Sequence, residues 1–303
     1  RRARDSKKNF NHLVAPKVER FRLIRRYEKE HRVDLMCRAL DVSRSGYYWR
    51  RGAAVSSREQ ENQVLLNQIK EIFENSRRTY GSPRVTEELQ ERGFRCGRHR
   101  VARLMRRAGI QAKVKKRFRA KGHKGKRFVG VPNLVQRVFS APQANRLWLA
   151  DITYIWTREG WTYLAAILDV YSRKIVGWSL GRRPTTELAR AAFERALGQR
   201  KVEPGLVHHS DQGAQYANHE YQALLKAKGI DGSMGDKGTC YDNAMMESFF
   251  HTLKTEHTYW QSYGSREEAE HSLFDYIELF YNAERRHSGV GYKSPSAFEK
   301  QNS

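Results

Sequence analysis

The chain has 303 residues and carries 57 Lys and Arg against 33 Asp and Glu, a formal net charge of +24. This length allows two or more domains. The longest apolar runs are too short to cross a bilayer, so we expect that the chain is not an integral membrane protein. The three cysteines lie far apart without a CxxC pair, which argues against a disulfide framework and a Cys-rich zinc site and leads us to expect a cytoplasmic location.

The positive charge is concentrated in the first half of the chain. Residues 1–140 hold 38 Lys and Arg against 13 Asp and Glu, a net charge of +25, and residues 141–303 hold 19 against 20, a net charge of −1. No acidic residue occurs between Arg92 and Ala150. A basic half beside a neutral half indicates a region that binds nucleic acid, attached to a region with another task. A merely soluble or ribosomal-type basic surface is the alternative.

Residues 1–55 predict a first helix-turn-helix module. Apolar residues recur at helical spacing, and Ser43 can cap the helix that follows them. The apolar face comprises Val33, Met36, Ala39 and Leu40. The second helix would present four side chains to DNA: Arg44, Ser45, Tyr47 and Tyr48. Any small helical hairpin gives a similar pattern, which is the alternative.

Residues 61–110 predict a second module of the same kind. Its first helix has apolar residues at Val64, Leu65, Ile69, Ile72 and Phe73. Pro83 begins a second helix that ends at Gly93, and Gly109 ends a third. The third helix buries Val101, Leu104 and Met105 and carries arginines on its other face, namely Arg98, Arg100, Arg103, Arg106 and Arg107. These arginines are candidates for groove or phosphate contact, or else form a solvated cationic face.

The segment 111–140 is expected to be a basic linker. It begins with a run rich in Lys, Arg and Gly, which includes Lys115, Lys116 and Arg117. Such a run would follow a phosphate backbone by charge rather than by shape.

Beyond residue 141 the pattern changes to strands. Three runs rich in β-branched and aromatic residues, 145–156, 160–172 and 174–181, predict a meander. A helix, a short strand at 205–211 and further helices follow, the last of them at 265–286 with a capping box from Ser265 to Glu268. This order predicts an α/β core with a mixed sheet flanked by helices.

Three carboxylates stand in unusual settings within this core. Asp151 lies inside the apolar strand "WLADITYI", where an unpaired carboxylate needs compensation. Asp211 ends a predicted strand, and such ends gather ligands in open α/β sheets. Glu247 shares a helical face with His251 and Lys254, opposite a buried face of Met246, Phe249, Phe250 and Leu253. An ordinary turn Asp and an exposed i,i+4 pair are the alternatives.

Clustered carboxylates hold Mg²⁺ through oxygen ligands and leave positions for water and phosphate. With two ions, one activates the attacking oxygen and the other stabilises the leaving oxygen of an in-line displacement at phosphorus. Three acids on separate elements beside a strongly basic region therefore favour phosphodiester chemistry.

The spacing of these acids resembles that of the DDE transposases and retroviral integrases. It leaves 59 residues between Asp151 and Asp211 and 35 between Asp211 and Glu247. Within that superfamily the chain is similar to the OrfB reading frame of bacterial insertion sequences that move by copy-out/paste-in. The resemblance covers nearly the whole chain and rests on long motifs, among them "VSRSGYYWR", "RRTYGSPRVTEEL", "HHSDQGAQYANHEY", "GTCYDNAMMESFFHTLKTE" and "YNAERRHSGVGYKSPSAF".

The resemblance implies a ribonuclease H-like catalytic core at 141–260 and a C-terminal helical segment at 261–303. It implies that Asp151, Asp211 and Glu247 bind two Mg²⁺ or Mn²⁺ ions and that Lys254 contacts DNA near the scissile phosphate. It also implies double-stranded DNA as partner, both as terminal inverted repeats and as target. A dimer or larger assembly on DNA in the bacterial nucleoid is expected, with an upstream OrfA product as a further partner.

One departure from the family lies just before the catalytic helix. The family reads "SMSRKGNCYDNA", and this chain reads "SMGDKGTCYDNA", so that Gly235 and Asp236 replace a Ser-Arg pair. A cation is lost and an acid gained, which predicts altered strand contacts there. Two other functions stay open from the sequence, a non-catalytic DNA-binding repressor or remnant and a ribonuclease H-like nuclease without strand transfer.

Overall fold

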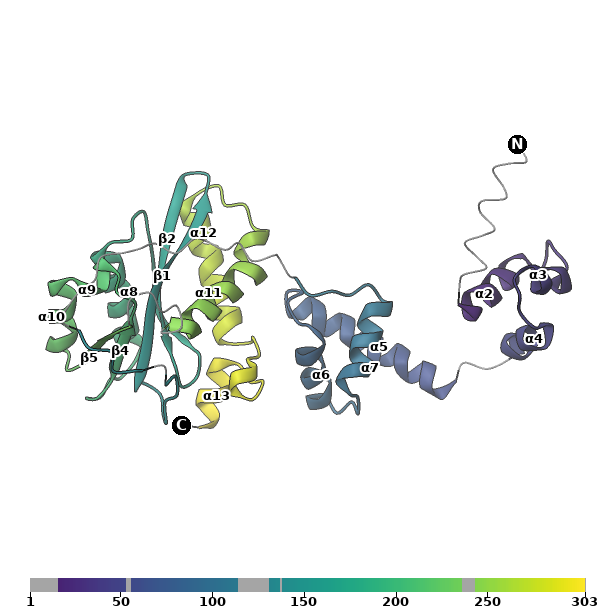
Figure 1. The fold of residues 1–303 in the computed structure, drawn as a ribbon, viewed down its shortest axis with the longest axis horizontal. Coiled ribbons are helices and arrows are strands. Elements are labelled where there is room, and N and C mark those ends of the chain that lie inside the picture. Colours follow the sequence, from purple (N-terminus) through teal and green to yellow (C-terminus); the bar gives the residue numbers. More distant parts are fainter. Residues whose placement is uncertain (1–15, 53–55, 114–130, 137, 236–242, 303) are drawn as a thin grey trace. The chain divides into compact units, whose positions relative to one another are not determined.

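A computed structural model gives the fold and describes residues 16–52, 56–113, 131–136, 138–235 and 243–302 (Figure 1). The chain forms two compact units, Arg1–Gln68 and Ile69–Ser303, which are described separately below. Within the described residues, no helix combines the length and apolar character that a bilayer span requires.

The first unit contains a small helical domain. Its helices are α2 (Lys17–Tyr27), α3 (Val33–Ala39) and α4 (Arg44–Gly52). They enclose a core of Ile24, Cys37 and Tyr47. The predicted cap is confirmed, because the Ser43 hydroxyl accepts a hydrogen bond of 3.1 Å from the Gly46 backbone N–H. The predicted face of α3 was wrong at Ala39, which is exposed, because the buried stripe passes through Cys37 instead.

A second helical group begins with α5 (Ser57–Asn75). The first part of this helix, up to Gln68, belongs to the first unit, and the rest belongs to the second. Its other helices are α6 (Ser82–Glu91), which has Pro83 in its first turn, and α7 (Arg98–Arg107). Gly93 and Gly109 have φ of +84° and +68°, so both predicted helix ends fall at left-handed glycines. Of the apolar residues noted in its sequence, Val64 is 53% exposed, because the buried face of α5 passes through Leu65.

A five-stranded mixed sheet forms the centre of the second unit. Its strands are β1 (Leu147–Thr157), β2 (Gly160–Asp169), β3 (Ile175–Gly181), β4 (Val207–Ser210) and β5 (Asp231–Met234). They lie in the order β3-β2-β1-β4-β5. The first three form the predicted antiparallel meander, and β4 and β5 run parallel to β1. The strand β5 was not predicted, because its sequence "DGSM" lacks an apolar or β-branched run.

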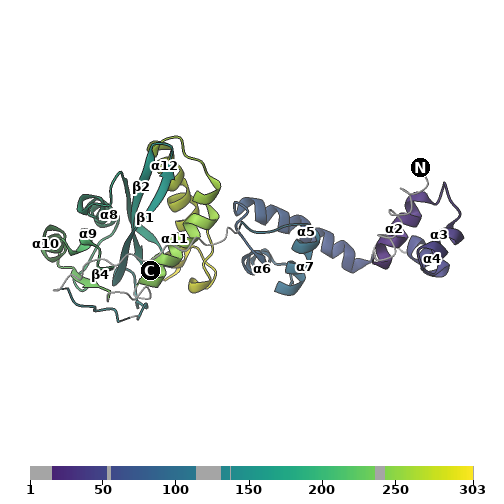
Figure 2. The same cartoon turned by 45° about the horizontal axis from the view of Figure 1, so that its top comes forward.

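Helices cover both faces of the sheet, as the sequence predicts. Figures 1 and 2 show α8 (Thr186–Gln199), α9 (Ala214–Ala217) and α10 (His219–Ala227) on one side. The other side carries α11 (Ala244–Glu256) and α12 (Arg266–Phe274). The main core packs α8 and α10 against β1 and β2, with Trp148 and Phe193 fully buried at its centre. This mixed sheet with helices on both faces is the expected ribonuclease H-like arrangement.

The C-terminal segment is helical in short pieces. The 3₁₀ turn η2 (Thr258–Trp260) precedes α12, which continues into the π-helical segment η3 (Asp275–Asn282). The 3₁₀ turn η4 (Ser288–Val290) and α13 (Pro295–Gln301) end the fold. The predicted cap at the start of α12 is confirmed, because Ser265 Oγ accepts from the Glu268 N–H at 3.1 Å.

The C-terminal segment also contacts the helical group at α6. The Arg286 guanidinium donates to Glu91 and Glu88, and its backbone N–H donates to the Tyr80 hydroxyl at 2.8 Å. Arg77 forms an ion pair with Asp275. These contacts join α6 and the residues around it to the end of the chain.

Candidate active site

The end of β4 sets the positions of the two aspartates. The parallel register of β1 and β4 pairs Leu147 with Val207 and ends by pairing Ala150 with Ser210. An aspartate follows each residue of this last pair, Asp151 within β1 and Asp211 just after β4, and neighbouring strands are about 4.8 Å apart. Both carboxyl groups line the same small cavity of about 140 Å³. The sheet thus brings together two acids that are 60 positions apart in the sequence.

A glycine holds the Asp211 carboxylate in place. The backbone N–H of Gly213 donates to Asp211 Oδ1 at 3.1 Å. A Cβ at Gly213 would lie 2.9 Å from that oxygen and 2.6 Å from Gln215 Oε1. A side chain at this position would therefore displace the Asp211 carboxylate or Gln215, so the glycine of the motif "SDQGAQY" has a steric reason that the sequence reading missed.

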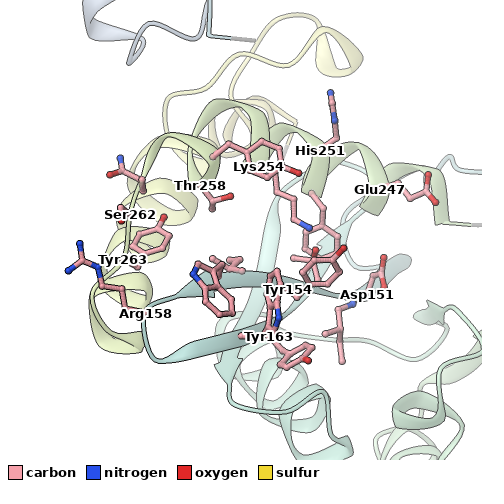
Figure 3. Close-up of a pocket in the computed structure, with 18 residues that line it drawn as sticks. Asp151, Tyr154, Arg158, Tyr163, Glu247, His251, Lys254, Thr258, Ser262 and Tyr263 are labelled. Atoms are coloured by element: carbon pink, nitrogen blue, oxygen red, sulfur yellow. Dashed lines mark hydrogen bonds between the residues drawn. The ribbon is translucent and has the colours of Figure 1, made fainter. Parts of the chain in front are cut away.

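The third acid, Glu247, lies one turn into α11. The side-chain amide of Asn243, which precedes this helix, donates to the Ala150 carbonyl at 3.2 Å. This hydrogen bond fixes the start of α11 beside β1, immediately before Asp151. Met246, Phe249, Phe250 and Leu253 form the buried face of α11, as the helical wheel predicts. Glu247 and Asp151 line one groove, and Figure 3 shows them on facing elements.

The surroundings of Asp151 disfavour the ionised form of its carboxyl group. Burial and the neighbouring Asp211 raise the pKa of Asp151 to about 8, with Glu247 as a further cause. The Ile152 N–H and Lys254 act in the opposite direction without offsetting this. Burial also raises the pKa of Asp211. Carboxylates that repel one another in this way are suited to sharing a cation.

The donor set fits a divalent metal ion in part. Asp151 and Asp211 supply hard oxygen ligands side by side, which is the chemistry that Mg²⁺ and Mn²⁺ prefer. Within the described residues, however, no three His, Cys, Asp or Glu side chains lie close enough together to hold a metal ion. The exposed Glu247 side chain would therefore have to turn toward the two aspartates.

A groove of about 1260 Å³ extends from the carboxylates along β1 and α11 (Figure 3). His251 and Lys254 line it together with Glu247, as expected from their shared helical face. The Lys254 ammonium lies 4.4 Å from the centre of the Tyr154 ring. The sequence reading also missed the aromatic side chains that line the groove. Tyr154, Trp156 and Trp161 are 42%, 57% and 48% exposed. The alternation of Tyr154 and Trp156 with buried Ile155 and Thr157 along β1 was the available signal.

The predicted DNA-contacting residues of the first module have mixed environments. Arg44 and Ser45 are exposed at the start of α4, and Tyr48 is 42% exposed. Tyr47 was wrongly predicted to face DNA. It is 2% exposed, packs in the domain core and donates its hydroxyl hydrogen bond to Glu28.

The predicted residues of the second module lie on α7. Arg98 and Arg103 are exposed and Arg100 is half-buried, opposite the buried Val101 and Leu104. The remaining predicted contacts, Lys115, Lys116 and Arg117, lie outside the described residues, as does Asp236.

Two histidines close to Asp211 in the sequence are part of the buried core and not of the candidate active site. His208 and His209 are 1% and 0% exposed. His208 Nε2 lies 3.1 Å from the Tyr221 hydroxyl, and His209 Nδ1 lies 2.9 Å from Ser233 Oγ. Burial lowers the pKa of His208 to about 4. Both side chains are committed to hydrogen bonds between neighbouring elements of the core.

Family models match three parts of the chain. A model described as an integrase core domain matches residues 141–240, a second one of that description matches 247–302, and an HTH-like domain matches 59–118. The two integrase-core matches contain all three candidate carboxylates.

Solved structures of low sequence identity also resemble the chain. The catalytic core domain of HTLV-2 integrase in complex with magnesium is 15% identical, with a TM-score of 0.41, over 52% of this chain and 98% of that one. A simian T-cell lymphotropic virus intasome chain is 14% identical, with a TM-score of 0.45, over 73% of this chain and 70% of that one.

Curated relatives are much more similar. The transposase InsF for insertion sequence IS3A of Escherichia coli is 41% identical over 281 residues, 92% of this chain and 98% of that protein. An uncharacterized 31 kDa protein of insertion element IS600 from Shigella sonnei is 42% identical over 266 residues, 88% of this chain and 98% of that protein. The chain therefore belongs to the IS3-type insertion-sequence transposases, a branch of the DDE transposase and integrase superfamily.

Proposed function

We propose that Asp151, Asp211 and Glu247 are the catalytic carboxylates with which this transposase cleaves DNA at the ends of an insertion sequence and transfers the freed 3′-OH. The observation that supports the assignment is the β1–β4 register, whose last pair, Ala150 and Ser210, is followed by an aspartate on each segment. The hydrogen bond from Asn243 to β1 adds support, because it brings the helix of Glu247 to the same place.

In the proposed reaction the carboxylates hold Mg²⁺ or Mn²⁺, with two ions per site. When bound, such ions activate the attacking oxygen and stabilise the leaving oxygen of an in-line displacement. In the first step water attacks phosphorus and the P–O3′ bond breaks, which leaves a 3′-OH and a 5′-phosphate. In the second step that 3′-OH attacks a target phosphodiester and displaces its 3′ oxygen. The number of phosphodiester bonds is conserved in this transfer, so no ATP is required.

The groove beside the carboxylates is suited to a DNA strand. Lys254 and Arg158 supply positive charge along it, and the exposed rings of Trp156 and Trp161 supply surfaces on which bases can stack. The two rings pack edge to face, with centroids 4.9 Å apart. A strand whose scissile phosphate lies at Asp151 would pass Lys254 and then reach these rings.

The helical domains would bind the ends of the element. Exposed Arg44 and Ser45 on α4, and Arg98, Arg100 and Arg103 on α7, are the proposed contacts to the terminal inverted repeats. Lys115, Lys116 and Arg117 extend this basic region in the sequence. Because two ends must be joined to one target, we propose a dimer or larger assembly on DNA in the bacterial cytoplasm. An upstream OrfA product is proposed as a further partner.

Strand-transfer assays with precut element ends test the assignment. Asp151→Asn is expected to abolish joining in Mg²⁺, whereas Asp231→Asn, which changes an exposed carboxylate on β5, is expected to retain it. Unchanged joining by Asp151→Asn would show that the carboxylate assignment is wrong. Cleavage without any joined product in the wild type would instead indicate a nuclease, and DNA binding without either reaction would indicate a repressor.

A further inference from the structure

A second polar cavity lies on the side of α11 away from the candidate active site. It has a volume of about 280 Å³ and is lined by parts of α11, the β2–β3 turn, α6 and the C-terminal segment. Five described cationic or titratable side chains line it, and none of them is a carboxylate: Arg84, Arg173, Tyr281, Arg285 and His287. None of the three candidate catalytic acids lines it.

Arg173 is held at this cavity by the backbone. It has a φ of +66°, and its N–H donates to the Asp169 carbonyl at 2.8 Å, which fixes the turn after β2. A Cβ at Gly289 would lie 3.4 Å from Arg173 Nη2 and 3.6 Å from its Cζ, so the guanidinium lies close over the glycine. The half-buried guanidinium has no hydrogen bond or ion pair to any described residue.

The other two arginines share one carboxylate. Arg285, which is 3% exposed, donates to both oxygens of Glu256 at 2.7 and 2.6 Å. Arg84 lies 3.6 Å from the same carboxylate and donates to the Arg286 carbonyl at 2.9 Å. The described residues around the cavity therefore contribute three guanidinium groups and one carboxylate, so that two positive charges are not compensated.

This excess of positive charge affects the pKa values of two further side chains. The pKa of His287 is lowered well below its usual value by burial and then by Arg285, Arg84 and Arg173. The pKa of Tyr281 is raised by burial, and the same three arginines oppose that shift. These shifts agree with the lining of the cavity, to which all three arginines contribute.

We propose that this cavity is a binding site for a phosphate group. Arginine guanidinium groups bind phosphate oxygens in pairs of parallel hydrogen bonds, and Arg173 has its donors available for that contact. Ser248 and Thr252 of α11 add hydroxyl groups to the lining. The volume corresponds to several water molecules at about 30 Å³ each, which is enough for a tetrahedral oxyanion. A cation or an apolar ligand would leave the two positive charges uncompensated.

The phosphate could come from two sources with the same chemistry. One is a phosphodiester of the DNA backbone, and the other is a free phosphate or phosphate monoester. The site is separate from the candidate active site, so its occupation does not depend on the assignment of the three carboxylates.

Calorimetric titration with inorganic phosphate tests the site on the full chain, in EDTA and at constant ionic strength. We expect Arg173→Gln to weaken this binding at least tenfold, whereas Arg190→Gln, an exposed arginine on α8, leaves it unchanged. Arg173→Lys keeps the charge without the paired donors and is expected to bind at an intermediate level. Tryptophan fluorescence of each variant checks that it is folded.

Duplex DNA binding at several salt concentrations distinguishes the two sources. If the ligand is a DNA phosphate, Arg173→Gln is expected to reduce the slope of log K against log salt by about one. An unchanged slope together with lost phosphate binding points to a free phosphate. Equal phosphate affinity and equal slopes in Arg173→Gln and Arg190→Gln would overturn the proposal.

Discussion

The buried ion pair of Glu256 and Arg285 gives the sharpest prediction about stability. The pair is 9% and 3% exposed, is joined by two hydrogen bonds of 2.6 and 2.7 Å, and accepts a third from the Tyr276 hydroxyl at 3.1 Å. Glu256→Gln removes the negative charge and leaves the guanidinium buried. Attraction between unit charges about 4 Å apart is worth about 4 kcal/mol at an effective dielectric constant of ~20.

We therefore expect Glu256→Gln to lower the free energy of unfolding by about 3–5 kcal/mol, the usual effect of removing one partner of a buried pair. Urea denaturation followed by tryptophan fluorescence measures it, since five of the six tryptophans lie between residues 148 and 260. The double variant Glu256→Leu with Arg285→Met is expected to lose less than Glu256→Gln, because the most deeply buried charge is removed together with its partner and only the more exposed Arg84 loses a carboxylate. A loss below about 1 kcal/mol for Glu256→Gln would refute the reasoning.

Three further predictions concern the site and the first module. Without metal, Asp151→Asn is expected to raise the thermal stability at pH 7.5 but not at pH 4, because burial and Asp211 raise the pKa of Asp151 to about 8 and so penalise folding only above its unfolded value near 3.8. A gain at both pH values would contradict this. Gly213→Ala is expected to reduce strand joining at least tenfold with a small change in melting temperature, because its Cβ would displace Asp211 Oδ1. Tyr47→Phe is expected to cost about 1 kcal/mol of stability through its lost bond to Glu28, while filter binding shows unchanged DNA affinity.

Periodicity in the sequence was sufficient for much of the fold. The β-branched and aromatic runs predicted β1 to β3, and the helical wheel placed Glu247 and Lys254 on one face of α11, where both line the groove. The sequence could not show that Asp151 and Asp211 lie next to each other, because that depends on a strand register set by packing. The local setting of each acid favoured a shared metal site, and the spacing shared with a known family added independent support for grouping all three.

Other features depend on contacts between distant segments. Tyr47 occupies a position on α4 that a helix-turn-helix pattern assigns to DNA, yet its ring packs in the small core with Ile24 and Cys37. The phosphate-binding cavity collects Arg84, Arg173 and Arg285 from three regions that no local motif connects. Among the buried acids, the sequence alone does not distinguish Asp169, whose carboxylate accepts from the N–H groups of Asn145 and Tyr171, from a catalytic acid.

The contacts of Arg286 bear on how truncated copies of this gene can be told from intact ones. A premature stop codon shortly after Lys254 would leave Asp151, Asp211 and Glu247 in the open reading frame, so that a truncated copy would still display the complete signature of an active element. It would nevertheless lack the partners of Tyr80 and Glu88, together with Glu256 and the arginine that neutralises it. An intact copy of this gene is therefore better recognised by the codons for Glu256, Arg285 and Arg286 than by its acidic triad alone.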